Sequence, residues 1–182
     1  MKFIKTEIPE VIIFESKVYA DERGYFFESF KKESFEKFIG HAVNFCQDNE
    51  AKSTKGVLRG LHYQLPPFAQ SKLVRVIKGT VLDIAVDIRK NSRTFGEHVA
   101  IELSESNKKQ LFVPKGFAHG YVVLSEEAIF AYKVDNYYHK ASERGILFND
   151  KTLQIDWKFP LNEVMVSEKD KNQPAFSDAD LF

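Results

Sequence analysis

Residues 73–88 read Leu-Val-Arg-Val-Ile-Lys-Gly-Thr-Val-Leu-Asp-Ile-Ala-Val-Asp-Ile, and they hold the clearest structural signal in the chain. The tight-turn sequence Lys78-Gly79-Thr80 separates two apolar runs. In the second run, every other residue from Leu82 to Ile88 is a large aliphatic one, which is the period of two that a β-strand shows. We therefore expect two strands joined by a short glycine turn.

Similar short apolar runs recur along the chain, separated by Gly, Pro, Asn or Asp. Beyond 73–77 and 81–88, the expected strands are 11–14, 26–30, 57–63, 98–103, 110–113, 120–124, 129–134 and 145–148. Many short strands with regular turn signals predict an all-β sandwich or barrel. Helical spacing occurs only in short segments, chiefly Lys32 to Ile39, where Gly40 can end the helix.

The composition bounds the class of protein. A chain of 182 residues with 43% hydrophobic residues suits one domain. We expect that domain to span residues 1–182, with about the last ten as a peripheral tail. The 26 Lys and Arg residues balance the 26 Asp and Glu residues. The zero net charge argues against a nucleic-acid-binding protein, which would carry a basic excess.

The chain also lacks the marks of export or membrane insertion. Its N-terminal residues 1–7 contain no sustained apolar segment of the kind a signal peptide has, and no run is long enough to span a bilayer. Cys46 is the one cysteine, so no internal disulfide can form, and we expect it to be a small buried side chain. These features predict a cytoplasmic protein.

Two polar clusters interrupt this apolar pattern. One is Arg59-Gly60-Leu61-His62-Tyr63-Gln64 with Lys72 soon after it, and the other is Pro114 to Gly120, which contains His119. Polar groups inside a β-barrel are costly unless they are paired or used, so two such clusters indicate a pocket. A regular strand would place Arg59 and His62 on opposite faces. If both serve one pocket, a bulge near Gly60 is required.

Each candidate also has a structural interpretation. His62 could be a core histidine satisfied by hydrogen bonds, and Lys72 a solvated lysine at a strand end rather than a cation that stabilises a substrate oxygen. Tyr132 could pack in the core or serve as an acid. Asp170 could close a helix start through the Ser167-x-x-Asp170 pattern, or it could pair with a histidine and raise its basicity.

Motifs for metals and common cofactors are weak or missing. Pro114 to His119 is typical of the second cupin motif, but His62-Tyr63-Gln64 lacks the second histidine of the first motif. The remaining histidines show no ligand spacing, so we expect no catalytic metal. The chain has no P-loop, no dinucleotide-binding glycine pattern and no Gly-x-Ser-x-Gly element, and we expect no organic cofactor.

Several longer motifs resemble one family. They are Gln47-Asp48-Asn49, 55–64, 67–70, 72–75, 86–89, 94–96, 114–120, Tyr137-Tyr138 and 143–146. Together they resemble the dTDP-4-dehydrorhamnose 3,5-epimerase family over about Arg23 to Asp170. The resemblance implies a cupin-type jelly-roll β-barrel with a few short peripheral helices. It also implies a homodimer that uses neither metal nor organic cofactor.

The resemblance further implies roles for individual residues. His62 matches the base that removes protons from C3 and C5 of a dTDP-linked 4-keto-6-deoxy sugar, and Asp170 matches its carboxylate partner. Tyr132 matches the acid that returns a proton from the opposite face, and Lys72 the lysine that steadies the enolate oxygen. The matching substrate-binding positions are Arg23, Glu28, Gln47, Asn49, Arg59, His119, Tyr138, Glu143 and Lys169. Among these, Arg23 and Glu28 resemble residues that reach a substrate in the partner subunit, and Tyr138 the ring that stacks on thymine.

The chain departs from its relatives at two places near the pocket. Glu50-Ala51 follows Asn49 where many relatives carry His-Ser or Trp-Ser, and Tyr121 stands where phenylalanine is frequent. Three hypotheses follow for function. The first is 3,5-epimerisation of dTDP-4-dehydro-6-deoxy-D-glucose in dTDP-L-rhamnose biosynthesis. The second is epimerisation of one carbon for another deoxysugar, and the third is a non-catalytic sugar-nucleotide-binding cupin.

Overall fold

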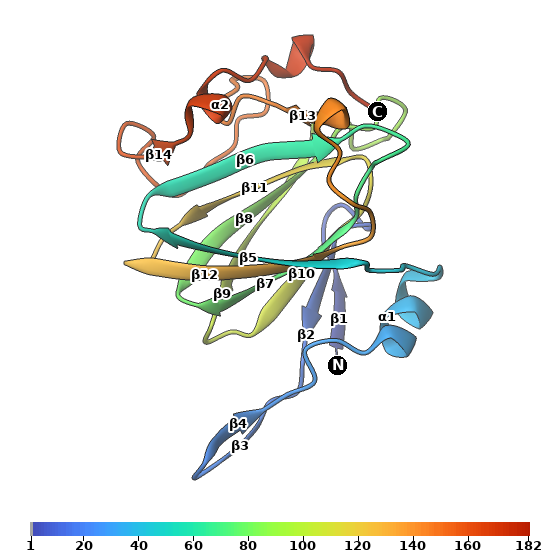
Figure 1. Ribbon diagram of the computed structural model, residues 1–182, viewed down its shortest axis with the longest axis vertical. Helices are drawn as coiled ribbons and strands as arrows, with labels where there is room; N and C mark the ends of the chain where they lie inside the picture. The colour runs from blue at the N-terminus through green and yellow to red at the C-terminus, as the bar shows by residue number, and fades with distance from the viewer. Residues whose placement is uncertain (1) are drawn as a thin grey trace.

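The computed structural model of the protein describes residues 2–182 as two antiparallel sheets that pack into a barrel (Figure 1). In spatial order, the first sheet consists of β1 (Lys2–Lys5), β2 (Ile12–Glu15), β10 (Lys109–Val113), β7 (Lys72–Lys78), β12 (Glu127–Val134) and β5 (Gln47–Thr54). The second consists of β13 (Glu143–Gly145), β6 (Val57–Gln64), β11 (Phe117–Val123), β8 (Thr80–Asp87) and β9 (His98–Ser104). The short β14 (Met165–Val166) pairs in parallel with β6.

The predicted pair of strands around Gly79 is β7 and β8, which lie in different sheets. The glycine is required there because its φ is +80° and a Cβ would lie 2.1 Å from the carbonyl oxygen of Glu127. This turn passes the chain from one wall of the barrel to the other. The strong apolar signal of 73–88 therefore marks the place where the two sheets are joined.

Strand β8 is buried on both faces. Its predicted aliphatic face, with Leu82, Ile84 and Val86, packs under the C-terminal segment against Trp157 and Phe176. Its other face, with Val81 and Ala85, lies in the core between the two sheets. Asp83 belongs to this inner face and is fully buried. A carboxylate in that position needs partners, and it finds them in the pocket described below.

Strand β5 was not among the predicted strands. Its sequence Gln-Asp-Asn-Glu-Ala-Lys-Ser-Thr alternates between exposed and partly buried positions, but the inward positions are polar or small. Hydrophobic periodicity finds a strand by its apolar core face, and β5 has none. Its inward face lines a pocket, and its pairing with β12 runs along eight residues.

Some element boundaries differ from the sequence prediction. The expected strand 26–30 is instead β4 (Gly24–Phe26), which forms an exposed hairpin with β3 (Tyr19–Asp21) that projects from the barrel (Figure 1). The expected strand 145–148 is shifted to β13. The predicted helix is confirmed as α1 (Lys32–Ile39), and Gly40 ends it in the left-handed conformation.

The sequence requires a bulge near Gly60 if Arg59 and His62 are to serve one pocket, and β6 contains such a β-bulge. His62 pairs with His119 of β11, whereas Arg59 pairs with Tyr121, so three steps on β6 match two on β11. The extra residue turns Arg59 to the same face as His62. Gly60 lies inside this bulge with φ +126°, and a Cβ there would approach Gly120 Cα to 2.6 Å. The backbone at this point therefore requires glycine.

The C-terminal third of the chain covers the outer face of the second sheet. It carries the short helix α2 (Glu168–Lys171) and the 3-10 turns η1 (Lys140–Ser142) and η2 (Phe176–Asp178). The last ten residues pack on this face through Phe176, and the hydroxyl of Tyr63 donates to the Asp180 carbonyl at 2.8 Å. No helix within residues 2–182 has the length and apolar character needed to cross a membrane.

The prediction that Cys46 is buried is wrong, because this side chain is exposed. Cys46 lies just before β5 at the edge of the first sheet, where its backbone N–H donates to Val134 O at 2.9 Å and its thiol contacts the same carbonyl at 3.6 Å. An edge position leaves one side of the residue open to solvent.

Candidate active site

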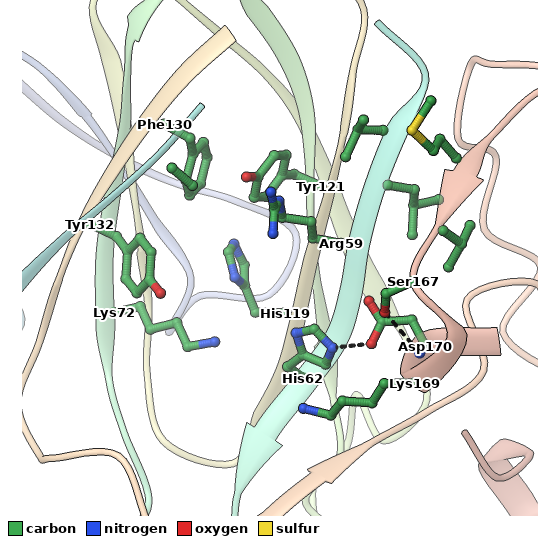
Figure 2. Close-up of a pocket in the computed structure, with 15 residues that line it drawn as sticks. Arg59, His62, Lys72, His119, Tyr121, Phe130, Tyr132, Ser167, Lys169 and Asp170 are labelled. Carbon is green, nitrogen blue, oxygen red and sulfur yellow. Dashed lines mark hydrogen bonds and ion pairs between the residues drawn. The ribbon is translucent and has the colours of Figure 1, made fainter. Parts of the chain in front are cut away.

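A cavity of about 570 Å³ opens into the barrel between β6, β11, β12 and the segment that contains α2. Figure 2 shows the side chains of His62, Lys72, Tyr132 and Asp170 gathered around it. A neighbouring cavity of about 340 Å³ shares His62, Lys72 and Tyr132 with the first. The structure thus brings together side chains from two sheets and from the C-terminal segment, including the four predicted catalytic residues.

His62 and Asp170 form a hydrogen-bonded pair. The distance from His62 Nε2 to Asp170 Oδ1 is 2.6 Å, and the residues are 108 positions apart in the sequence. The other carboxylate oxygen accepts a hydrogen bond from the backbone N–H of Gly60 at 3.3 Å. Burial tends to raise the pKa of Asp170, but these hydrogen bonds hold it below its ordinary value. Asp170 is therefore ionised and fixes the imidazole.

This geometry decides between the two interpretations of Asp170. Ser167 does cap α2, since its hydroxyl oxygen accepts from the Asp170 backbone N–H at 3.1 Å. The Asp170 carboxylate is directed to His62, so closing the helix start is not its only role. With Nε2 of the imidazole bonded to Asp170, its Nδ1 is left as the proton acceptor that faces the cavity (Figure 2).

Beside His62 in the same sheet, His119 is bonded to the buried carboxylate of Asp83, and Lys72 faces them from β7 of the other sheet. His119 Nε2 lies 2.9 Å from Oδ1 of Asp83, and the two residues are 6% and 0% exposed. Burial lowers the pKa of Lys72 to about 8, against the attraction of Asp83 and Glu143. The sequence prediction that His119 lies in the pocket agrees with this geometry, and one of its ring nitrogens is committed to Asp83.

Tyr132 extends from β12 into the same cavity, opposite His62 (Figure 2). Burial raises the pKa of its phenol, with the charge of Arg59 acting in the other direction. The hydroxyl therefore keeps its proton at neutral pH and can act as a general acid. A base on one wall and an acid on the other is the arrangement needed to remove a proton from one face of a carbon and return it to the opposite face.

Arg59 supplies an unpaired cation at one end of the cavity. Its Nε donates to Ser53 Oγ at 3.1 Å. Among residues 2–182, no carboxylate lies within ion-pair distance of its guanidinium. A guanidinium with free donors is suited to bind a phosphate or a carboxylate of a ligand.

A polar rim surrounds the second cavity. Gln47 Nε2 donates to Asn49 Oδ1 at 2.7 Å, and both residues line this cavity. Glu143 accepts a hydrogen bond from the hydroxyl of Tyr138 at 3.0 Å and forms an ion pair with Lys169. Burial tends to raise the pKa of Glu143, but Lys169 and Tyr138 hold it below its ordinary value. These five residues, which the family resemblance gives as substrate-binding, therefore lie close together.

Two of the predicted substrate-binding residues, Arg23 and Glu28, lie away from the cavity of their own chain. Arg23 is at the tip of the exposed β3–β4 hairpin, where its guanidinium pairs with Asp21 at 2.6 Å. Glu28 follows the hairpin, and its backbone carbonyl accepts from the Ser16 hydroxyl at 2.8 Å. The hairpin points away from the barrel that holds His62 (Figure 1).

Sequence reasoning missed two residues of the pocket. Asp83 stood out only as a polar residue in an apolar strand, and that pattern was a signal that could have found it. The sequence places Tyr121 only near the pocket, whereas in the structure it is 5% exposed and lines the cavity. Within residues 2–182, no three His, Cys, Asp or Glu side chains converge in a way that could hold a metal ion.

Comparisons with known proteins agree with this geometry. Residues 5–178 match a family model described as dTDP-4-dehydrorhamnose 3,5-epimerase. The dTDP-4-dehydrorhamnose 3,5-epimerase of Shigella flexneri is 58% identical over 182 residues, covering 100% of this chain and 99% of that protein. The crystal structure of the enzyme of that name from Elizabethkingia anophelis NUHP1 has a TM-score of 0.94 at 53% identity, covering 98% of this chain and 97% of that one.

A second solved structure carries a ligand. The dTDP-6-deoxy-D-glucose-3,5-epimerase of Legionella pneumophila Philadelphia 1, in complex with dTDP-4-keto-L-rhamnose, has a TM-score of 0.94 at 48% identity. The match covers 97% of this chain and 93% of that one. These structural matches confirm the expected all-β, cupin-type jelly-roll barrel.

The electrostatics of the cavity predict an unusual titration of Lys72. Its ammonium is expected to lose its proton near pH 8 because the site is buried. Asp83→Asn removes a carboxylate that raises the Lys72 pKa, so this variant is expected to titrate lower still. NMR titration of isotope-labelled lysine side chains measures both values. Lys78, whose pKa is raised by Glu127, is the internal control. A Lys72 signal that titrates with the exposed lysines, unmoved by Asp83→Asn, would contradict the assignment.

Proposed function

The chain belongs to the dTDP-4-dehydrorhamnose 3,5-epimerase family and is an isomerase of that type, and we propose that His62 and Tyr132 carry out its proton transfers. The substrate that the family implies is dTDP-4-dehydro-6-deoxy-D-glucose, inverted at C3 and C5 on the way to dTDP-L-rhamnose. The observation that carries the proposal is the placing of His62 and Tyr132 on opposite walls of one cavity. We also propose that the protein is cytoplasmic.

In the first step His62 removes a proton from a carbon beside the C4 carbonyl. Such a proton is weakly acidic, so the base must be placed and the enolate stabilised. Asp170, 2.6 Å from Nε2, holds the ring with Nδ1 toward the substrate and stabilises the imidazolium that forms. The ammonium of Lys72 lies at the same cavity and would bind the C4 oxygen as negative charge develops there.

In the second step the enolate collapses and the carbon takes a proton from the opposite face. Tyr132 is suited to this step because its raised pKa keeps the phenol protonated until the enolate needs it. The proton at each carbon is thus lost to one wall of the cavity and regained from the other. No metal or organic cofactor has a part in this scheme, since the protein side chains supply the base, the acid and the cation.

The remaining pocket residues are proposed to hold the nucleotide. Arg59 would bind the diphosphate, and His119 would contact the sugar beside it. Gln47, Asn49, Glu143 and Lys169 would contact the substrate at the rim, where Tyr138 is 57% exposed and free to stack on the thymine ring. The apolar remainder of the cavity would exclude water from the enolate.

We propose that the working unit is a homodimer with shared sites. The β3–β4 hairpin exposes Tyr19, Tyr25 and Phe26 by more than half of their surface, which is unfavourable for a monomer. It projects too far from its own barrel to cover it (Figure 1). Crossing to a second copy would bury these rings and would bring Arg23 and Glu28 to the partner's cavity.

Solvent exchange tests the reaction directly. The dTDP-linked keto-sugar, incubated with the protein in heavy water, is expected to take up deuterium at both C3 and C5, which NMR of the recovered sugar locates. Deuterium at one carbon only would favour the single-carbon epimerase. Recovery of the sugar without deuterium at either carbon would reject the reaction and favour the hypothesis of a non-catalytic sugar-nucleotide-binding cupin.

Two variants separate the proton carriers in the same experiment. His62→Ala is expected to stop exchange at both carbons because no base remains. Tyr132→Phe is expected to permit exchange without inversion, since His62 can return deuterium to the face from which it took the proton. If His62→Ala turned over normally, the mechanism would be wrong even though the family is right.

Asp170→Asn tests the carboxylate. Loss of the charge beside the imidazole is expected to lower kcat by about 10²-fold or more, within the range of general acid–base effects. Circular dichroism should show an unchanged fold. Glu168→Gln, on the exposed side of the same short helix, is the matched control and should retain wild-type kcat. Equal rates for the two variants would remove Asp170 from the mechanism.

Mixed dimers test the shared site. His62→Ala and Arg23→Ala are each expected to be weakly active alone. In a mixed dimer, one of the two sites would combine the intact His62 of one subunit with the intact Arg23 of the other. Each mixed dimer is therefore expected to have up to half of the activity of a wild-type dimer. Light scattering gives the oligomeric state. No recovery in verified mixed dimers would show that Arg23 does not act across an interface.

A further inference from the structure

The hydroxyl of Tyr121 is a buried polar group that the mechanism does not use. The residue lies on β11, is 5% exposed and lines the main cavity. Among the buried side-chain polar atoms of residues 2–182, the Tyr121 oxygen is the one that has no hydrogen-bond partner. A buried hydroxyl without a partner destabilises the folded protein, and a ligand atom that pairs with it would remove this cost.

The ring of Tyr121 is held firmly, which fixes the hydroxyl. It stacks on Phe130 with the ring centroids 4.1 Å apart and the planes 16° from parallel. In the pairing of β11 with β6, Tyr121 stands directly opposite Arg59. Figure 2 shows the Arg59 side chain and the Tyr121 ring at the same end of the cavity, away from Asp170.

The neighbourhood of the hydroxyl favours an anionic ligand oxygen. Burial raises the pKa of Tyr121, while the charge of Arg59 and the nearby Ser53 hydroxyl oppose that rise. The phenol therefore stays protonated and lies within the field of the guanidinium, and Ser53 Oγ does not satisfy it with a hydrogen bond of normal geometry. Arg59 is exposed, and the hydrogen bond to Ser53 Oγ leaves its terminal nitrogens available. A phosphate oxygen can accept from a guanidinium and a phenol together. Movement of Arg59 toward such an oxygen would uncover the hydroxyl.

We propose that the Tyr121 hydroxyl donates a hydrogen bond to a diphosphate oxygen of the substrate, beside Arg59. The inference rests on the proposed function, because it takes the ligand to be a nucleoside diphosphate sugar. Tyr121 is then a substrate-binding residue, and it touches neither of the carbons that react.

The test is Tyr121→Phe, which keeps the stacked ring and removes only the oxygen. Calorimetric titration with dTDP is expected to show a Kd raised about tenfold, as for the loss of a hydrogen bond to a charged group. The melting temperature of the free protein is expected to stay equal or to rise, because an unpaired buried hydroxyl has been removed. With the keto-sugar substrate, KM should rise while kcat stays close to wild type.

Tyr63→Phe is the matched control. Tyr63 is also 5% exposed, but its hydroxyl is already bonded to the Asp180 carbonyl. Its loss is expected to lower the melting temperature and to leave the Kd for dTDP unchanged. The proposal is overturned if Tyr121→Phe binds dTDP within twofold of wild type, whether or not its stability or kcat changes. Weakened dTDP binding in a protein that fails to exchange C3 and C5 would support the subsite and reject the proposed reaction.

Discussion

The hydrogen bond between His62 and Asp170 is the contact on which the site depends. It spans 108 positions in the sequence and joins the barrel strand β6 to the C-terminal segment. The same carboxylate accepts from the Gly60 backbone inside the β-bulge, so one buried anion holds both the imidazole and the irregular strand that presents it. Asp170 is 3% exposed, and a buried charge of this kind is tolerated only when it is well hydrogen-bonded.

A second buried carboxylate, in the same sheet as His62, complements this pair. Asp83 is fully buried and bonded to His119, and its charge offsets part of the penalty that burial imposes on the Lys72 ammonium. The pKa of Lys72, about 8, remains high enough for the side chain to be charged at neutral pH. A cation in such a position gains affinity for an oxygen that becomes negative, because little water competes with it. Asp83 does not line the cavity itself, but from the barrel's inner face it holds His119 and helps to keep Lys72 charged.

The pocket also explains why the barrel has an irregular wall. A regular β6 would point Arg59 away from His62, and a typical β5 would fill the interior with aliphatic side chains. The bulge and the polar inner face of β5 leave room for the cavity beside the packed core cluster, which includes Val74, Leu103 and Phe117. The interior of the barrel therefore holds a packed apolar core and, next to it, the charged groups of the pocket.

The sequence by itself determined the all-β class, helix α1 and most of the residues that gather in the pocket, because these rest on local periodicity, on a glycine stop and on distinctive motifs. It could not find β5, whose inward residues lack the apolar character by which strands are recognised. It left open whether Asp170 caps a helix or pairs with His62, and whether Arg59 and His62 share a face. Only the tertiary structure decided these points, because each depends on contacts between segments far apart in the chain: the bulge against β11, and the docking of the C-terminal helix on β6.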